Sequence, residues 1–354
     1  MAYTDIDDPS AFFQTALYTS TGSALSVVNT GNSDLQPDLI WIKSRSEGQL
    51  HCLFNSSHTG EFLSSNLVAA SDTSAGGVTS YNTDGFSIGT LGGINNGTNT
   101  HVAWQWKTGT AFSNDASSTS VGTIDSTGSV NTTSGFSIIS YTGNGSANQS
   151  VAHGLGATPK IILIKNRTTA GYWCMTNPRF VSVSDPNILY LQTTAAEADD
   201  TNINGTTAPS STVFGVDDYG AVNTSGNAHI AYCFTPIKGY SSMGTYVGNA
   251  STNGTFVYTG MKPAWVMFRK AAGTGSWAIQ DNKRTPFNVQ QKALFANLAD
   301  AESNSADNNV DFLSNGFKLK SDTANYNTNG DTYIYLAFAE SPFVTSTGIP
   351  ATAR

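Results

Sequence analysis

Three versions of one apolar run decide the fold: Leu39-Ile-Trp-Ile-Lys43, Ile161-Ile-Leu-Ile-Lys165 and Ala264-Trp-Val-Met-Phe-Arg269. Each run follows a proline, and a basic residue stands six positions after that proline. The pairs are Pro37 with Lys43, Pro159 with Lys165, and Pro263 with Arg269. The first run is apolar at successive positions, which indicates a strand buried on both faces, as at the centre of a sandwich.

Two further landmarks recur around these runs. A turn signature precedes each proline by 17 to 19 residues, and an asparagine stands six residues before an aromatic strand that closes the unit. The signatures are Tyr18-Thr-Ser-Thr-Gly22, Tyr141-Thr-Gly143 and Tyr246-Val-Gly248; the asparagines are Asn95, Asn223 and Asn327; the closing strands begin at His101, His229 and Tyr333. The resulting period is too long for a solenoid unit of roughly 20 to 50 residues and matches an ordinary domain.

The sequence therefore predicts three tandem domains of one repeated fold. We place them at residues 1–112 with an N-terminal arm, 113–238 and 239–345, followed by a C-terminal tail at 346–354. Residues 5–18 form either an anchoring arm or a first strand.

Composition favours an all-β chain. Charged residues make up 12% of the sequence, about half the usual share of roughly 25%, so long amphipathic helices are excluded. Short apolar runs alternate with Asn-Gly and Asp-Gly turns, which is typical of hairpins. Only residues 62–70 and 290–300 have apolar spacing that suggests a helical turn or two. We predict two-sheet β-sandwiches with jelly-roll or Greek-key connections.

Charge and cysteine usage exclude several classes of protein. The net charge is −8 and basic residues do not cluster, so we predict no binding to nucleic acid. No apolar run reaches the length of a membrane span and no signal peptide is recognisable, so we predict neither membrane insertion nor secretion. Cys52 and Cys174 occupy the same place in two repeats, which favours three buried, unbridged thiols with Cys233.

Catalytic motifs are lacking. His153 has no neighbouring nucleophile motif or second histidine at metal-ligand spacing, which favours a turn residue. The adjacent acids Asp199-Asp200 and Asp217-Asp218 do not recur in the repeats, which favours solvated loops over a glycosidase pair. We therefore predict no enzymatic activity, no catalytic residue, no cofactor and no metal site.

Two groups of residues are candidates for binding. Asp281, Asn282, Lys283 and Arg284 form the densest polar cluster, which either serves its own sheet or meets a ligand. Trp104 and Trp106 lie two apart on the closing strand, so both rings share one face. That face is either part of the core or a surface that stacks on a sugar or a neighbouring subunit.

The repeated basic residues have a structural interpretation. Arg45 and Arg167 stand two positions after Lys43 and Lys165, on the same side of a strand. We expect these side chains to pair with carboxylates or to cover an apolar sheet with their stems.

Four segments together resemble one known family: Asp8-Pro-Ser-Ala-Phe-Phe-Gln-Thr15; Gln36-Pro-Asp-Leu-Ile-Trp-Ile-Lys-Ser-Arg45; Tyr141-Thr-Gly-Asn-Gly145 with His153-Gly-Leu-Gly156; and Tyr333-Ile-Tyr-Leu-Ala-Phe-Ala-Glu-Ser-Pro-Phe343. The chain resembles virion-associated, tail-fibre-like structural proteins of tailed bacteriophages, typical of marine and cyanobacterial phages. The resemblance covers nearly the whole chain. It implies a place on the virion after assembly in the host cytoplasm, and no defined chemistry.

We therefore expect a virion structural protein, in the tail or a fibre, that serves particle architecture and host attachment. A capsid decoration protein and a glycan-binding or glycan-cleaving receptor module are the alternatives. The expected partners are further copies of the chain, with a trimer as the first expectation, other virion proteins and a host cell-surface glycan.

Overall fold

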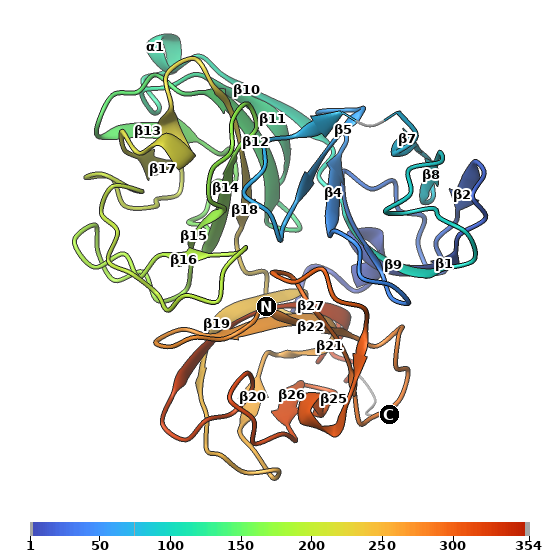
Figure 1. Ribbon diagram of the computed structural model, residues 1–354. Helices are drawn as coiled ribbons and strands as arrows, with labels where there is room; N and C mark the ends of the chain where they lie inside the picture. Colours follow the sequence, from blue (N-terminus) through green and yellow to red (C-terminus); the bar gives the residue numbers. More distant parts are fainter. Residues whose placement is uncertain (1–2, 74, 351–354) are drawn as a thin grey trace.

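The protein is nearly all β, as the composition predicts. The computed structural model describes residues 3–73 and 75–350. Its strands form three large sheets, each with a small sheet over one face, and all pairings between named strands in this described part are antiparallel. Figure 1 shows three lobes around a common centre, coloured blue, green to yellow, and orange to red. We call these lobes the first, second and third unit.

The first unit contains a six-stranded large sheet and a three-stranded small sheet. In spatial order the large sheet is β1 (Phe13–Thr19), β9 (Thr100–Trp106), β3 (Leu39–Ser44), β4 (Cys52–Asn55), β5 (Glu61–Ser64) and β6 (Asp72–Thr73). The small sheet is β2 (Leu25–Val27), β8 (Phe86–Ile88) and β7 (Val78–Tyr81). A 3-10 turn at Pro9–Ala11 precedes β1, so residues 5–18 supply a first strand.

The second unit has a seven-stranded large sheet and a two-stranded small sheet. The large sheet is β10 (Thr110–Asn114), β11 (Ser126–Asn131), β12 (Phe136–Thr142), β18 (Ala228–Phe234), β14 (Ile161–Asn166), β15 (Cys174–Thr176) and β16 (Leu189–Tyr190). The small sheet is β13 (Gln149–Ala152) and β17 (Val213–Val216), and two short helices are α1 (Ala116–Thr119) and α2 (Gly220–Asn223). The boundary predicted between residues 112 and 113 falls inside β10, which pairs with β11, so it is placed a few residues too late.

The third unit again has six strands in its large sheet and three in its small sheet. The large sheet is β19 (Ser241–Val247), β27 (Thr332–Pro342), β21 (Met261–Lys270), β22 (Ala278–Asp281), β23 (Lys292–Phe295) and β24 (Ser303–Asn304). The small sheet is β20 (Phe256–Tyr258), β26 (Gly316–Leu319) and β25 (Val310–Leu313), and a 3-10 turn lies at Ala306–Asn308. Of the predicted tail, Ser346 donates to Asp7 near the other end of the chain, and residues 351–354 lie outside the described part.

The closing strand lies beside the apolar-run strand in every large sheet: β9 beside β3, β18 beside β14, and β27 beside β21. Pro37 and Pro159 stand two residues before their strands, whereas Pro263 lies inside β21 at a β-bulge. All three prolines are buried. A bulge is one of the few places where a strand tolerates a residue without an N–H donor.

Each apolar run serves two cores. Trp41 and Leu39 of β3 point into a core shared by all three units, while Ile40 and Ile42 point into a core between the two sheets of the first unit. The same alternation places Ile161, Leu163, Trp265 and Met267 in the shared core. The separate domains that we predicted are therefore packed on one another, because a sheet that is apolar on both faces must be covered twice.

The two segments predicted to be helical, both within the described residues, each contain part or all of a short strand and no helix. β5 overlaps the first residues of segment 62–70, and β23 lies within segment 290–300. Phe62 enters the core of the first unit and the next residue, Leu63, enters the shared core. Apolar residues on both faces of a short strand produce the spacing that we interpreted as helical. The three cysteines are buried and unbridged, as predicted.

Candidate functional site

The repeated basic residues bind backbone carbonyls of a different unit. Lys43 Nζ donates to the carbonyl of Ala299 at 3.0 Å, Lys165 Nζ donates to that of Val68 at 2.8 Å, and Arg269 donates to that of Ala195. We call the acceptor segments, residues 64–71, 190–197 and 295–302, the straps. Carboxylate pairing was one of the two roles expected for these three residues; within residues 3–73 and 75–350 none of them forms an ion pair, and the acceptors are carbonyls.

A second hydrogen bond recurs at each strap. The backbone N–H groups of Ser71, Glu197 and Glu302 donate to the carbonyls of Arg167, Ala271 and Arg45, at 3.0, 2.9 and 2.8 Å. The strap of the first unit thus binds the second unit, the strap of the second binds the third, and the strap of the third binds the first. A heterologous contact that closes after three steps forms a ring.

Carboxylates do pair with the arginines two positions further on. Arg45 binds both oxygens of Glu302, at 2.8 and 3.0 Å, and Arg167 binds Glu61 at 2.6 Å. Burial lowers the pKa of Lys43 and of Lys165 to about 8. Lys43, Lys165 and Arg269, together with Arg45 and Arg167, therefore hold the units together and are not exposed to a ligand.

The repeated asparagines join two loops within each unit. Asn327 Oδ1 accepts from the backbone N–H of Asn249 at 2.8 Å, and its Nδ2 donates to the carbonyl of Ser251 at 2.9 Å. Asn95 and Asn223 make equivalent bonds to the loops that follow the first two turn signatures. The tyrosine of each signature donates to the carbonyl of the residue before the asparagine: Tyr18 to Ile94, Tyr141 to Val222, and Tyr246 to Tyr326. These bonds give the spacing of the landmarks a structural cause.

Two histidines at the second positions of β9 and β18 are expected to make stability depend on pH. His101 and His229 are buried against Tyr18 and Tyr141, with ring centroids 5.0 and 5.1 Å apart, and burial lowers the pKa of each histidine to about 4. An unfolded histidine binds a proton below pH 6.5 or so, whereas these two resist protonation down to about pH 4. We expect the free energy of unfolding to fall as pH drops from about 6.5 to 4, by up to about 1.4 kcal/mol per pH unit for each histidine.

The third unit supplies the control for this prediction, because Tyr333 occupies the same place and stacks on Tyr246. The double variant His101→Tyr, His229→Tyr is expected to show a shallower acid limb in urea unfolding measured at several pH values. His51 and His58 also have lowered pKa values, so a residual slope is expected. An unchanged acid limb in the double variant would contradict this assignment.

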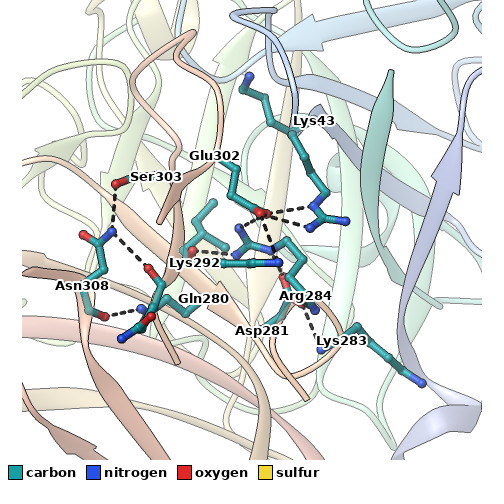
Figure 2. Close-up of polar contacts among 12 residues, drawn as sticks. Lys43, Gln280, Asp281, Lys283, Arg284, Lys292, Glu302, Ser303 and Asn308 are labelled. Carbon is teal, nitrogen blue, oxygen red and sulfur yellow. Dashed lines mark hydrogen bonds and ion pairs between the residues drawn. The ribbon is translucent and has the colours of Figure 1, made fainter. Parts of the chain in front are cut away.

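Two members of the predicted polar cluster, Asp281 and Arg284, belong to a buried network between the first and third units (Figure 2). Asp281 Oδ2 accepts from Arg284 Nε at 2.6 Å and from Trp104 Nε1 of the first unit at 3.0 Å. Arg284 also binds Glu302, which in turn binds Arg45. The side chains of Asp281 and Arg284 are fully buried. A buried pair with this many partners positions the two units and leaves no free charge for a ligand.

The other two members of the predicted cluster lie at the surface. Lys283 is exposed and points away from the network in Figure 2. Asn282 donates from Nδ2 to Glu340 Oε2 at 2.8 Å. Both residues line a pocket of about 410 Å³ between the first and third units. Of the four predicted residues, Asp281 and Arg284 are thus buried between the units, whereas Asn282 and Lys283 line the pocket.

Trp104 and Trp106 are 0% and 2% exposed and belong to the shared core. Both rings pack edge-on against Trp265 of the third unit, with centroids 6.2 and 5.7 Å away. Both rings therefore belong to the core, which is the first of the two interpretations given from the sequence, and neither is available to stack on a sugar.

The sequence analysis missed Trp173 and Trp277, which also hold straps. Their indole N–H groups donate to the carbonyls of Ser64 and Tyr190, at 2.9 and 3.2 Å. Both tryptophans stand 14 residues after a repeat proline, as His51 does in the first unit. That shared spacing was a usable signal.

Within residues 3–73 and 75–350, no cluster of three His, Cys, Asp or Glu side chains is placed to hold a metal ion. The helices of the same part of the chain are all too short or too polar to cross a membrane.

Comparison with known proteins gives one match. A family described as a domain of unknown function, DUF7483, matches residues 8–342, from the turn before β1 to the end of β27 and through all three units. No curated protein and no solved structure matches the chain. Because the match covers most of its length, the chain belongs to the DUF7483 family.

Proposed function

We propose that this protein is a structural component of a tailed-bacteriophage particle, built into the tail or a fibre, where it serves particle architecture and host attachment. The observation that carries the proposal is the closed ring of straps, through which three similar units of one chain bind one another in a threefold arrangement. We further propose that the three units are copies of one jelly-roll or Greek-key-like sandwich, because their large sheets share a strand order.

The threefold design is consistent with a place on the axis of a trimeric appendage. A homo-oligomer was expected because broad β-faces need cover, but in this chain the large sheets cover one another in the shared core. Contacts with further copies or with other virion proteins would therefore use strand edges and loops. We retain a cyclic homo-oligomer as part of the proposal.

The location is tested by immunogold labelling of purified particles with an antibody against the chain. Label at the tail or the fibre tips is expected. Label spread over the head would make the protein a capsid decoration, and the absence of the chain from purified particles would overturn the structural role. The mass of the purified protein in solution tests the oligomer separately.

A second candidate function, glycan binding, is favoured by an exposed aromatic pair on β20. Phe256 and Tyr258 are 43% and 56% exposed and lie two apart, so they share the outer face of the small sheet. Phe256 pairs across the sheet with Lys318, which can hydrogen-bond a hydroxyl beside the rings. Flat exposed rings next to polar groups suit the apolar faces and hydroxyls of a sugar.

The first unit shows that the fold does not need these rings. Val257 pairs with the buried Phe317 as Val27 pairs with the buried Phe86, so Ser26 of the first unit is the counterpart of Phe256. We expect the double variant Phe256→Ala, Tyr258→Ala to bind host cells with at most roughly one tenth of the original affinity, while its melting temperature stays unchanged. Unchanged cell binding in a flow-cytometry titration would remove this candidate.

A further inference from the structure

A lysine, an asparagine and a glutamate of the third unit meet at one oxygen atom. Glu340 Oε2 lies 2.7 Å from Lys262 Nζ and 2.8 Å from Asn282 Nδ2. Lys262 belongs to β21 and Glu340 to the neighbouring strand β27, while Asn282 directly follows β22 on the other side of β21. One carboxylate oxygen thus contacts both an amine and the nitrogen of a carboxamide.

The sheet holds the three side chains in place. Lys262 pairs with Ser341, the residue after Glu340, beside a β-bulge of β21. The backbone N–H of Asn282 donates to the carbonyl of Ala264 at 2.9 Å, which fixes the start of the loop after β22. Lys262 is 7% exposed, so its stem is packed and its amine has little freedom to move away. Groups held in contact in this way react far faster than the same groups free in water.

The sister units show that the fold does not need this arrangement. The backbone N–H of Ser56 donates to the carbonyl of Asp38 at 2.9 Å, as that of Asn282 does to Ala264, so these positions correspond. The repeat prolines and the closing strands align the other two positions. In place of the lysine, asparagine and glutamate, the first unit has Gln36, Ser56 and Thr108, and the second has Thr158, Pro178 and Pro236.

A carboxylate between an amine and a carboxamide can carry protons from one to the other. The Lys262 ammonium gives a proton to Glu340 and becomes a neutral amine, which is a nucleophile. Its lone pair attacks Cγ of Asn282, so that an Nζ–Cγ bond forms and the Cγ–Nδ2 bond breaks. Glu340 gives its proton to the leaving Nδ2, then takes a proton from the attacking nitrogen and passes it to the released ammonia. The products are a secondary amide and one ammonium ion, so atoms and charge balance and nothing is oxidised or reduced.

We propose that Lys262 Nζ and Asn282 Cγ form an isopeptide bond, with Glu340 as the group that carries the protons. Asn282 and Glu340 line the pocket of about 410 Å³ between the first and third units, which gives the ammonia a route to solvent. The bond ties β21 to the loop that carries Arg284, at the place where the third unit meets the first. A covalent link thereby supports a contact that is otherwise held by hydrogen bonds and ion pairs.

The test is the mass of the denatured full chain and of its tryptic peptides. Trypsin cleaves after Arg269 and Lys270, between the two residues, so the bond would join two peptides into one branched peptide. Lys262→Arg keeps the positive charge and removes the nucleophile, because a guanidinium stays protonated. Glu340→Gln keeps the shape of the side chain and removes the proton carrier. Lys270→Arg is the matched control, because Lys270 lies on the same strand and pairs with Asp331 at 2.5 Å.

The unchanged protein and the Lys270→Arg control are expected to be lighter than their sequences by one ammonia molecule and to yield the branched peptide. Lys262→Arg and Glu340→Gln are expected to keep the full mass and to yield two separate peptides. Full mass in the unchanged protein, before and after prolonged incubation, would overturn the proposal and leave the three groups as an ion pair with a hydrogen-bonded amide. A loss of ammonia that persists in Lys262→Arg would overturn the bond, and one that persists in Glu340→Gln would overturn the role of Glu340.

Discussion

Replacing Asp281 by alanine is expected to lower the free energy of unfolding by about 3–5 kcal/mol. The substitution leaves the Arg284 guanidinium buried with its closest carboxylate gone, and it removes the acceptor of the Trp104 indole N–H. Both partners lie where the first and third units meet, so the loss acts on the ring rather than on a loop. Urea unfolding followed by tryptophan fluorescence measures it.

Two controls separate the buried pair from its surroundings. Lys283→Ala, two residues away and exposed, is expected to change stability by no more than about 0.5 kcal/mol. The double variant Asp281→Leu, Arg284→Met removes both charges and is expected to be more stable than Asp281→Ala alone. A loss for Asp281→Ala no larger than that for Lys283→Ala would contradict the network.

Replacing Trp265 by alanine is expected to cost about 3–5 kcal/mol as well. Its ring is fully buried and lies within 6.4 Å, centroid to centroid, of four other rings: Phe13, Trp104, Trp106 and Phe338. Three of these belong to the first unit, so the cavity left behind opens across two units. Calorimetry of the variant measures the loss as a lowered melting temperature.

Tyr172→Ala provides the control for Trp265→Ala, because this aromatic residue is 43% exposed. It is expected to lower the melting temperature much less than Trp265→Ala. Equal effects of the two substitutions would show that the shared core contributes little to stability.

The sequence indicated the strand content and the three units because their landmarks recur at fixed spacing. The structure gives physical causes for most of that spacing. Tyr246 donates to the residue before Asn327, and Asn327 binds the loop that follows Tyr246. Lys43 donates to a carbonyl of a strap. The shared core was missed because an apolar face that meets another unit has the same pattern as one that meets its own small sheet. Trp41 and Ile42 are both apolar residues of one strand, and the sequence does not show that the first enters the shared core and the second the core of the first unit.

The straps could not be predicted for a different reason. Lys165 and Arg269 donate to backbone carbonyls, and a carbonyl acceptor leaves no mark on the sequence. The carboxylate partners of Arg45 and Arg167 are more than 100 residues away and do not occupy corresponding positions. Of the residues that line the pocket between the first and third units, the sequence singled out Asn282 and Lys283 because they stand in a dense polar cluster.

The straps and the shared core are expected to join the three units into one cooperatively folding body. Native-state hydrogen exchange at increasing denaturant tests this expectation most directly, because it reports the opening free energy of each central strand separately. We predict that the slowest amides of β9, β18 and β27 exchange with one common free energy and one denaturant dependence, and that Trp265→Ala lowers all three equally. Three different opening free energies, with the effect of Trp265→Ala confined to β27, would show that the units fold as separate domains.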